Sequence, residues 1–125
     1  MNYLGIDWGE KRIGLALGDD EVRIVSPFKV VASLQEVLDV IKDEDIEMAV
    51  VGEPRSIFNF QFSISNEGFN GFVKELKERG GVPVALMDER LSSKAADALS
   101  GSKKEKGARD AVAAMIILQS YFDKK

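Results

Sequence analysis

Three carboxylates occupy positions at which they could hold a divalent cation. Asp7 follows the apolar run Leu4-Gly5-Ile6 at the end of a predicted strand, and Glu89 follows a second apolar stretch at residues 84–87. Asp110 begins the predicted last helix. In open α/β sheets, ligands bind beside the carboxyl ends of the strands. Two divalent cations about 4 Å apart, held by several carboxylates, can activate water and stabilise the leaving oxygen of a phosphodiester. These acids therefore suggest a metal-dependent phosphodiesterase.

Each of the three acids also has a plainer interpretation. Asp7 could be a turn residue, and Glu89 could pair with Arg90 while Asp88 takes any functional role. Asp110 could be a helix N-terminal acid that the macrodipole favours. Spacing alone leaves these alternatives open.

The composition excludes several other chemistries. The 125 residues include no cysteine and no histidine, so disulfides, thiolate zinc sites and histidine general bases are ruled out. Any bound metal must take oxygen ligands, which favours Mg²⁺, Mn²⁺ or Ca²⁺. The net charge of −4 argues mildly against non-specific binding to nucleic acid. A catalytic role would therefore fall on carboxylates.

The hydrophobic pattern predicts a single α/β domain over residues 1–125. Strands are predicted at residues 3–7, 13–17, 22–25, 48–51 and 84–87. A helix is predicted near residues 34–41, because Ser33 and Glu36 have the spacing of a capping box before an apolar pattern of helical period. Further helices are predicted near residues 69–76, after Ser92, and at 110–122. Three strands with tight connections indicate an antiparallel meander, and the alternating strands and helices that follow indicate parallel strands. The expected architecture is a mixed five-stranded sheet with helices packed on it.

The termini and the apolar runs predict a cytoplasmic protein. The first residues lack a basic region and a cleavable apolar segment, so no secretory signal is expected. The longest apolar run, residues 111–118, is far shorter than the roughly 18 residues that a membrane span requires.

Four segments together resemble the YqgF-type family, whose members are described as pre-16S rRNA nucleases or Holliday-junction-resolvase-like proteins with a ribonuclease-H-like fold. The segments are residues 4–14 (LGIDWGEKRIG), 50–54 (VVGEP), 88–93 (DERLSS) and 103–121. Any one of them is weak, since the first also resembles a strand pair of actin-like kinases. Their order and spacing, which cover nearly the whole chain, make the combination specific.

The resemblance implies a nuclease that acts on nucleic acid, in the 5′-end maturation of pre-16S rRNA or on branched DNA. It implies that Mg²⁺ or Mn²⁺ is the cofactor and that the metal-binding acids are Asp7, Glu89 and Asp110. It also implies that a set of basic residues lies near the nucleic acid, namely Lys11, Arg12, Lys103, Lys104 and Lys106. The three lysines at 103–106 could equally be a solvated charge run.

One segment departs from the family pattern. After Pro54 the family usually has a polar, glycine-containing loop, whereas Phe58, Phe60, Phe62 and Ile64 alternate here with a period of two. This alternation is typical of a half-buried strand or a dimer contact. The sharper hypothesis is that one or two of the rings stack on unpaired bases.

Two rival functions come from other classes. One is a nucleic-acid-binding module without catalysis. The other is an actin-like phosphotransferase, which is disfavoured because those proteins pair two such domains around a nucleotide. The sequence leaves open RNA against DNA, endonuclease against exonuclease action, and the oligomeric state, although junction cleavage would favour a two-fold homodimer.

Overall fold

The computed structural model describes residues 1–9, 11–53, 67–88 and 106–124. Within these residues, five strands form one sheet in the order β3-β2-β1-β4-β5. The strands are β1 (Asn2–Trp8), β2 (Ile13–Asp19), β3 (Ile24–Val31), β4 (Met48–Glu53) and β5 (Val84–Asp88). The helices are α1 (Leu34–Asp43), α2 (Glu67–Gly80) and α4 (Lys106–Lys124). The β1–β2 and β2–β3 pairs are antiparallel, and the β1–β4 and β4–β5 pairs are parallel, so the predicted mixed sheet is confirmed.

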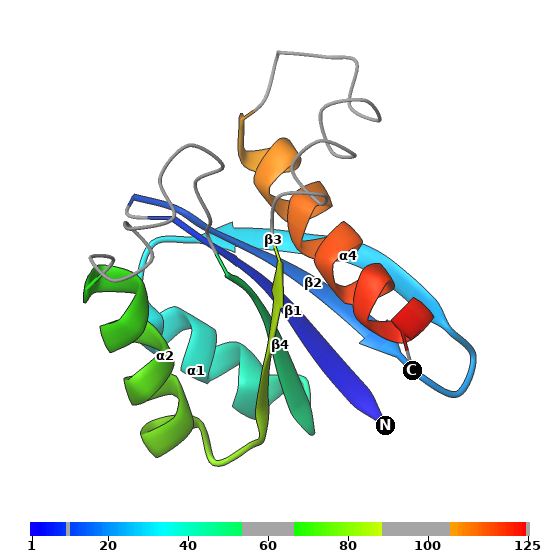
Figure 1. Ribbon diagram of the computed structural model, residues 1–125, viewed down its shortest axis with the longest axis horizontal. Coiled ribbons are helices and arrows are strands. Elements are labelled where there is room, and N and C mark those ends of the chain that lie inside the picture. Colours follow the sequence, from blue (N-terminus) through cyan, green and yellow to red (C-terminus); the bar gives the residue numbers. More distant parts are fainter. Residues whose placement is uncertain (10, 54–66, 89–105, 125) are drawn as a thin grey trace.

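The sheet separates two layers of helices, with α1 and α2 on one face and α4 on the other (Figure 1). Alternation along β1 sends its side chains to both layers. Leu4 and Ile6 belong to the larger core beneath α1 and α2, with Trp8 packed against it. Tyr3 belongs to the smaller core beneath α4, together with Phe122. Asp7 has the parity of Tyr3 and therefore lies on the α4 side.

Glycines on the α4 side of the sheet let this helix approach the strands closely. A Cβ atom on Gly5 would lie 2.6 Å from the carbonyl oxygen of Ala114, and one on Gly18 would lie 2.7 Å from Cδ2 of Leu118. Ala111, Ala113 and Ala114 are buried on the helix itself. Small residues on both partners therefore allow α4 to lie directly on β1 and β2.

Helix α1 starts at the capping box that the sequence predicts. The Ser33 side chain accepts a hydrogen bond from the backbone N–H of Glu36, and the Glu36 side chain accepts one from the backbone N–H of Ser33. These reciprocal bonds satisfy N–H groups that a helix start leaves without intrahelical partners. Val37 and Ile41 are buried at the predicted helical spacing.

Two predicted elements have wrong boundaries. Strand β3 begins at Ile24 and runs on to Val31, because Arg23 takes a positive φ of 54° and belongs to the preceding turn. Pro27 is tolerated inside β3 because this is an edge strand, where a missing N–H leaves no ladder bond unmade. Helix α4 begins at Lys106, one turn before the predicted start at Asp110.

Several sequence predictions fall outside the described residues. They are the short helix after Ser92 and the phenylalanine-rich segment 58–64. Within the described ranges, no helix has both the length and the apolar character needed to cross a membrane.

Candidate functional site

Asp7 is the next-to-last residue of β1, the central strand of the sheet. Its backbone is fixed from both sides, because Asp7 pairs with Gly14 on β2 and with Gly52 on β4. The side chain is half-buried, and its Oδ1 atom is buried. The strand therefore presents a carboxylate at its carboxyl end, on the face that α4 covers, as the sequence predicts.

Gly14 brings Asp110 to the same corner of the sheet. A Cβ atom on Gly14 would lie 2.1 Å from the carbonyl oxygen of Asp110, so the backbones of β2 and α4 touch at this point. Asp7 is the cross-strand partner of that same glycine. Two of the three predicted acids are thus neighbours of one residue, although more than a hundred positions separate them in sequence.

The position of Asp110 in its helix weakens the plainer interpretation of this acid. Asp110 is the fifth residue of α4, and the first turn of that helix contains no acidic residue. The macrodipole acts mainly on charges within the first or last turn. Gly107 lies in the first turn of α4, although glycine is a poor helix former.

Four of the predicted site residues are described in part or not at all. Glu89 follows Asp88, the last residue of β5, and lies outside the described residues, as do Lys103 and Lys104. Lys106 is the first residue of α4, and its side chain is not described. Among the side chains that the structure does describe, no three acidic groups gather closely enough to hold a metal ion. The described part of the site is therefore the pair of Asp7 and Asp110.

The strand register places the end of β5 at the same edge of the sheet as Asp7. Asp7 pairs with Gly52 on β4, and Gly52 pairs in turn with Met87 on β5. Ala85 and Met87 pack into the smaller core beneath α4. The odd-numbered residues of β5 therefore share the face on which Asp7 lies.

Arg12 makes a contact that the sequence did not predict. Its Nε–H donates to Oδ2 of Asp110 at 2.8 Å, across a sequence separation of 98 residues. The Arg12 side chain is 49% exposed and that of Asp110 is 25% exposed. Lys11, beside it, is exposed. The family resemblance implies that Arg12 lies near nucleic acid and that Asp110 binds metal, and neither role indicates that the two side chains meet.

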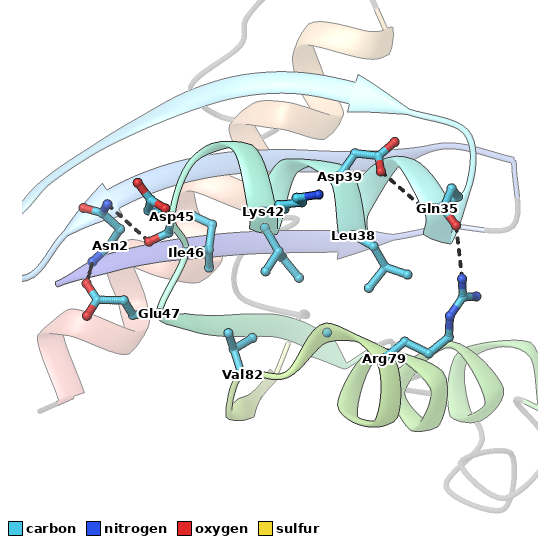
Figure 2. Close-up of a pocket in the computed structure, with 12 residues that line it drawn as sticks. Asn2, Gln35, Leu38, Asp39, Lys42, Asp45, Ile46, Glu47, Arg79 and Val82 are labelled. Carbon is cyan, nitrogen blue, oxygen red and sulfur yellow. Dashed lines mark hydrogen bonds between the residues drawn. The ribbon is translucent and has the colours of Figure 1, made fainter.

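A hollow of about 870 Å³ lies away from these residues, along α1 and the end of α2 (Figure 2). Its lining includes Leu38, Ile41 and Val82, and Arg79 Nη2 donates to Gln35 Oε1 at 3.1 Å across it. Because α1 and α2 cover the opposite face from α4, the hollow is separated by the sheet from Asp7. The corner that holds Asp7 and Asp110 is therefore distinct from it.

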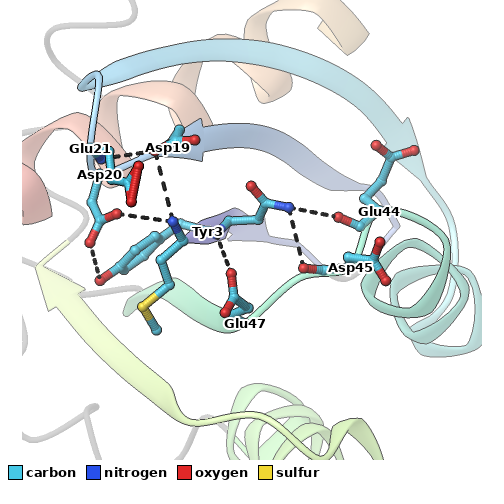
Figure 3. Close-up of polar contacts among 9 residues, drawn as sticks. Tyr3, Asp19, Asp20, Glu21, Glu44, Asp45 and Glu47 are labelled. Carbon is cyan, nitrogen blue, oxygen red and sulfur yellow. Dashed lines mark hydrogen bonds and ion pairs between the residues drawn. The ribbon is translucent and has the colours of Figure 1, made fainter.

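The opposite end of the sheet, where β1 begins, is strongly acidic (Figure 3). The amine of Met1 lies 3.3 Å from Oδ1 of Asp20, and the backbone N–H of Asn2 donates to Oε1 of Glu47 at 2.9 Å. Six acidic residues gather there, namely Asp19, Asp20, Glu21, Glu44, Asp45 and Glu47. The end of the sheet away from Asp7 and Asp110 therefore has its own group of acidic side chains.

Comparison with known proteins identifies relatives over almost the full chain. A family model described as "RuvX: Holliday junction resolvase" matches residues 1–124. A protein of Anaeromyxobacter sp. (strain Fw109-5) is 37% identical, with 98% of this chain and 97% of that protein covered. A protein of Methylobacillus flagellatus is 38% identical, with 96% and 89% covered. Both relatives are named "Putative pre-16S rRNA nuclease".

Solved structures agree on the fold. The chain superimposes on Thermus thermophilus RuvC in complex with a Holliday junction substrate with a TM-score of 0.65. The two are 20% identical, and 99% of this chain and 95% of that one are covered. This likeness, with the sheet order β3-β2-β1-β4-β5, establishes a RuvC-like ribonuclease-H fold. The full-length match to the family model and the identity to its relatives show that the chain belongs to the RuvX, or YqgF-type, family.

Proposed function

We propose that this protein is a metal-dependent nuclease that hydrolyses phosphodiester bonds in the 5′-end maturation of pre-16S rRNA, in the cytoplasm. The relatives named for that activity support the substrate. The observation that supports metal-dependent chemistry is that Asp7 and Asp110 both lie beside Gly14. Gly14 pairs with Asp7 and touches the backbone of Asp110, so that a strand end and a helix present acids at one corner.

The described donors fit a hard divalent cation such as Mg²⁺ or Mn²⁺. The chain offers oxygen ligands without histidine or cysteine, and Oδ1 of Asp7 is buried beside α4. We propose that Asp7, Glu89 and Asp110 hold the metal, with Asp7 as the central ligand. The odd-numbered residues of β5 face α4, and the same alternation continued to residue 89 would add its carboxylate to this corner. Bound cations would supply Lewis-acid activation of water and stabilise charge on the leaving oxygen.

The protein's own residues would bind and orient the nucleic acid. Lys11 is exposed beside Arg12, whose guanidinium contacts Asp110. We propose that the phosphates are contacted by the basic residues of two segments, namely Lys11, Arg12, Lys103, Lys104 and Lys106. Contacts of this kind fix the register of a strand and carry little sequence information. Substrate choice would then depend on the shape of the RNA around the precursor end.

A cleavage assay with defined RNA tests this proposal. An RNA that carries the precursor 5′ end of 16S rRNA is incubated with the protein in Mn²⁺ or in EDTA. We expect a product shortened at the 5′ end in Mn²⁺ and intact RNA in EDTA. RNA that is bound tightly but left intact in every metal would support the alternative of a binding module without catalysis.

A second candidate is a nuclease that acts on branched DNA. The description of the family model favours it, because that description is a Holliday junction resolvase. Resolving a junction requires paired cuts, so this function would call for a two-fold homodimer with two copies of the corner. A four-way DNA junction in the same assay, with the mass of the protein in solution measured by light scattering, separates the candidates. Paired cuts in the junction by a dimer, with RNA left intact, would replace the ribosomal proposal.

A further inference from the structure

The ion pair between Arg12 and Asp110 joins two parts of the candidate site. Arg12 lies in the connection between β1 and β2, directly before Ile13, and Asp110 lies on α4. The donor is Nε–H of the guanidinium, and the acceptor is Oδ2 of the carboxylate, 2.8 Å away. The short distance and the charged partners make this a charge-assisted hydrogen bond.

The same carboxylate oxygen would be needed by a metal ion. A carboxylate oxygen that accepts an N–H from a cation shares its lone pairs and its charge with that cation. A divalent ion at bonding distance of Oδ2 would also lie within a few ångströms of the guanidinium, where like charges repel. The repulsion ends only when the guanidinium moves away from the metal ion.

We propose that Arg12 is a positioning residue whose guanidinium holds Asp110 in the metal-free protein and is displaced from Oδ2 when a divalent cation binds. The inference rests on the proposed metal-dependent function. The displaced side chain would then be available to a substrate phosphate at the same corner. Metal binding would thereby favour the contact of Arg12 with a phosphate. Because such coupling is reciprocal, phosphate binding would favour metal binding by the same factor.

The exposure of the pair is consistent with displacement. Arg12 is 49% exposed, so its guanidinium can return to water without leaving an unsatisfied buried charge. Exposed ion pairs contribute little to stability. The guanidinium of Arg12 is therefore a weak competitor of a metal ion for the carboxylate of Asp110. Asp110 is the more enclosed partner at 25% exposure, so its carboxylate would stay in place while the arginine moves.

Calorimetric titration with Mn²⁺ alone, without nucleic acid, tests the proposal on the wild-type protein and three variants. Arg12→Gln removes the competing charge, and we expect it to tighten Mn²⁺ binding by roughly three- to fivefold. Arg12→Lys keeps a cation at this position and should bind Mn²⁺ much as the wild type does. Lys11→Gln, the matched control, removes the same charge from the adjacent residue and should tighten binding by less than about twofold.

A second measurement separates this role from a structural one. Arg12→Gln should show a larger increase in melting temperature on addition of Mn²⁺ than the wild type, because its metal site is filled more readily. In the cleavage assay it should need less Mn²⁺ for half-maximal activity and show a higher KM for RNA. A structural role would lower stability in EDTA and in Mn²⁺ alike.

The outcomes distinguish the inference from the function on which it rests. If wild-type protein and all variants bind no Mn²⁺, the proposed metal centre fails and the inference fails with it. If Mn²⁺ binds but Arg12→Gln leaves its affinity unchanged or weakens it, the inference alone is overturned. An equal increase in Mn²⁺ affinity in Arg12→Gln and Lys11→Gln would also overturn the inference. The loss of one positive charge near the site would then account for the change.

Discussion

A Cβ atom added to Gly14 would lie 2.1 Å from the carbonyl oxygen of Asp110 and 2.9 Å from the backbone nitrogen of Ala111. Backbone atoms cannot rotate away as a side chain can, so this contact fixes how closely α4 approaches β2. Because Asp7 pairs with Gly14, the contact also sets where the two carboxylates lie relative to each other.

Gly14→Ala should therefore damage both the fold and the site. We expect a loss of about 1 to 3 kcal/mol in the free energy of unfolding, of the size seen for overpacked sites, together with a loss of cleavage. Urea denaturation measures the first effect, and the RNA assay measures the second. Gly71→Ala is the matched control, since a Cβ there meets nothing within 4 Å on α2. It should raise stability by up to about 1 kcal/mol through helix propensity.

Asp7→Asn should remove catalysis while the fold persists. The amide has the size of the carboxylate but lacks the charge that a divalent cation needs. A loss of about 3 kcal/mol of transition-state stabilisation corresponds to a rate lower by about 100-fold. Initial rates of RNA cleavage in Mn²⁺ check this, and circular dichroism checks the fold.

Asp39→Asn provides the control for that substitution. Asp39 lies on α1, on the opposite face of the sheet, where its Oδ1 accepts a hydrogen bond from Gln35 at 3.1 Å. Its rate should equal that of the wild type. Full activity in Asp7→Asn would remove the proposed metal chemistry.

Changing Lys103, Lys104 and Lys106 together to glutamine should flatten the salt dependence of RNA binding. Each lost phosphate contact lowers the slope of log K against log salt by about 0.7 for a single strand. Binding measured by fluorescence anisotropy at several salt concentrations gives the slope. The control changes three lysines in α1 and α2, namely Lys42, Lys74 and Lys77, and should shift affinity slightly while leaving the slope unchanged. If the slope of log K against log salt is the same for the wild type and the 103–106 variant, these lysines face solvent and do not contact phosphates.

Ser33→Ala should lower stability without affecting the site. It removes the side-chain oxygen that accepts from the Glu36 backbone in the capping box, and the loss of such a cap costs about 1 kcal/mol. Thermal unfolding measures the change, and Ser26→Ala on the exposed edge strand β3 is the control. Activity should be retained because α1 lies on the face away from α4. A lower cleavage rate at temperatures where Ser33→Ala is fully folded would contradict the expectation that changes on the α1 face of the sheet leave the site on the α4 face unaffected.

The sequence predicts well those features that depend on residues close together in the chain. Short apolar runs bounded by turn residues predicted the strands, and Ser33 with Glu36 predicted the start of α1, because both patterns depend on neighbours within a few residues. Asp7 was predicted at a strand end for the same reason. Strand β3 was misplaced because its length is set by pairing with β2 and by the positive φ of Arg23.

The features that the sequence could not predict depend on contacts between distant segments. The pairing of Arg12 with Asp110 spans 98 residues, and neither residue type indicates the other. The close approach of α4 at Gly14 is likewise set by the packing of a helix from one end of the chain on a strand from the other. A glycine in a strand indicates close approach of some backbone, but the sequence does not identify which one.

The gathering of acidic side chains where β1 begins has a consequence for encounters in solution. A polyanion that approaches that end of the protein is repelled by the electrostatic field of the six carboxylates. Lys11 and Arg12 lie at the opposite end, beside the carboxylates of the proposed site. Under the proposed function, this repulsion would favour the approach of an RNA or a DNA toward the end that holds Asp7 and Asp110, although the overall charge of the protein has the same sign as the nucleic acid.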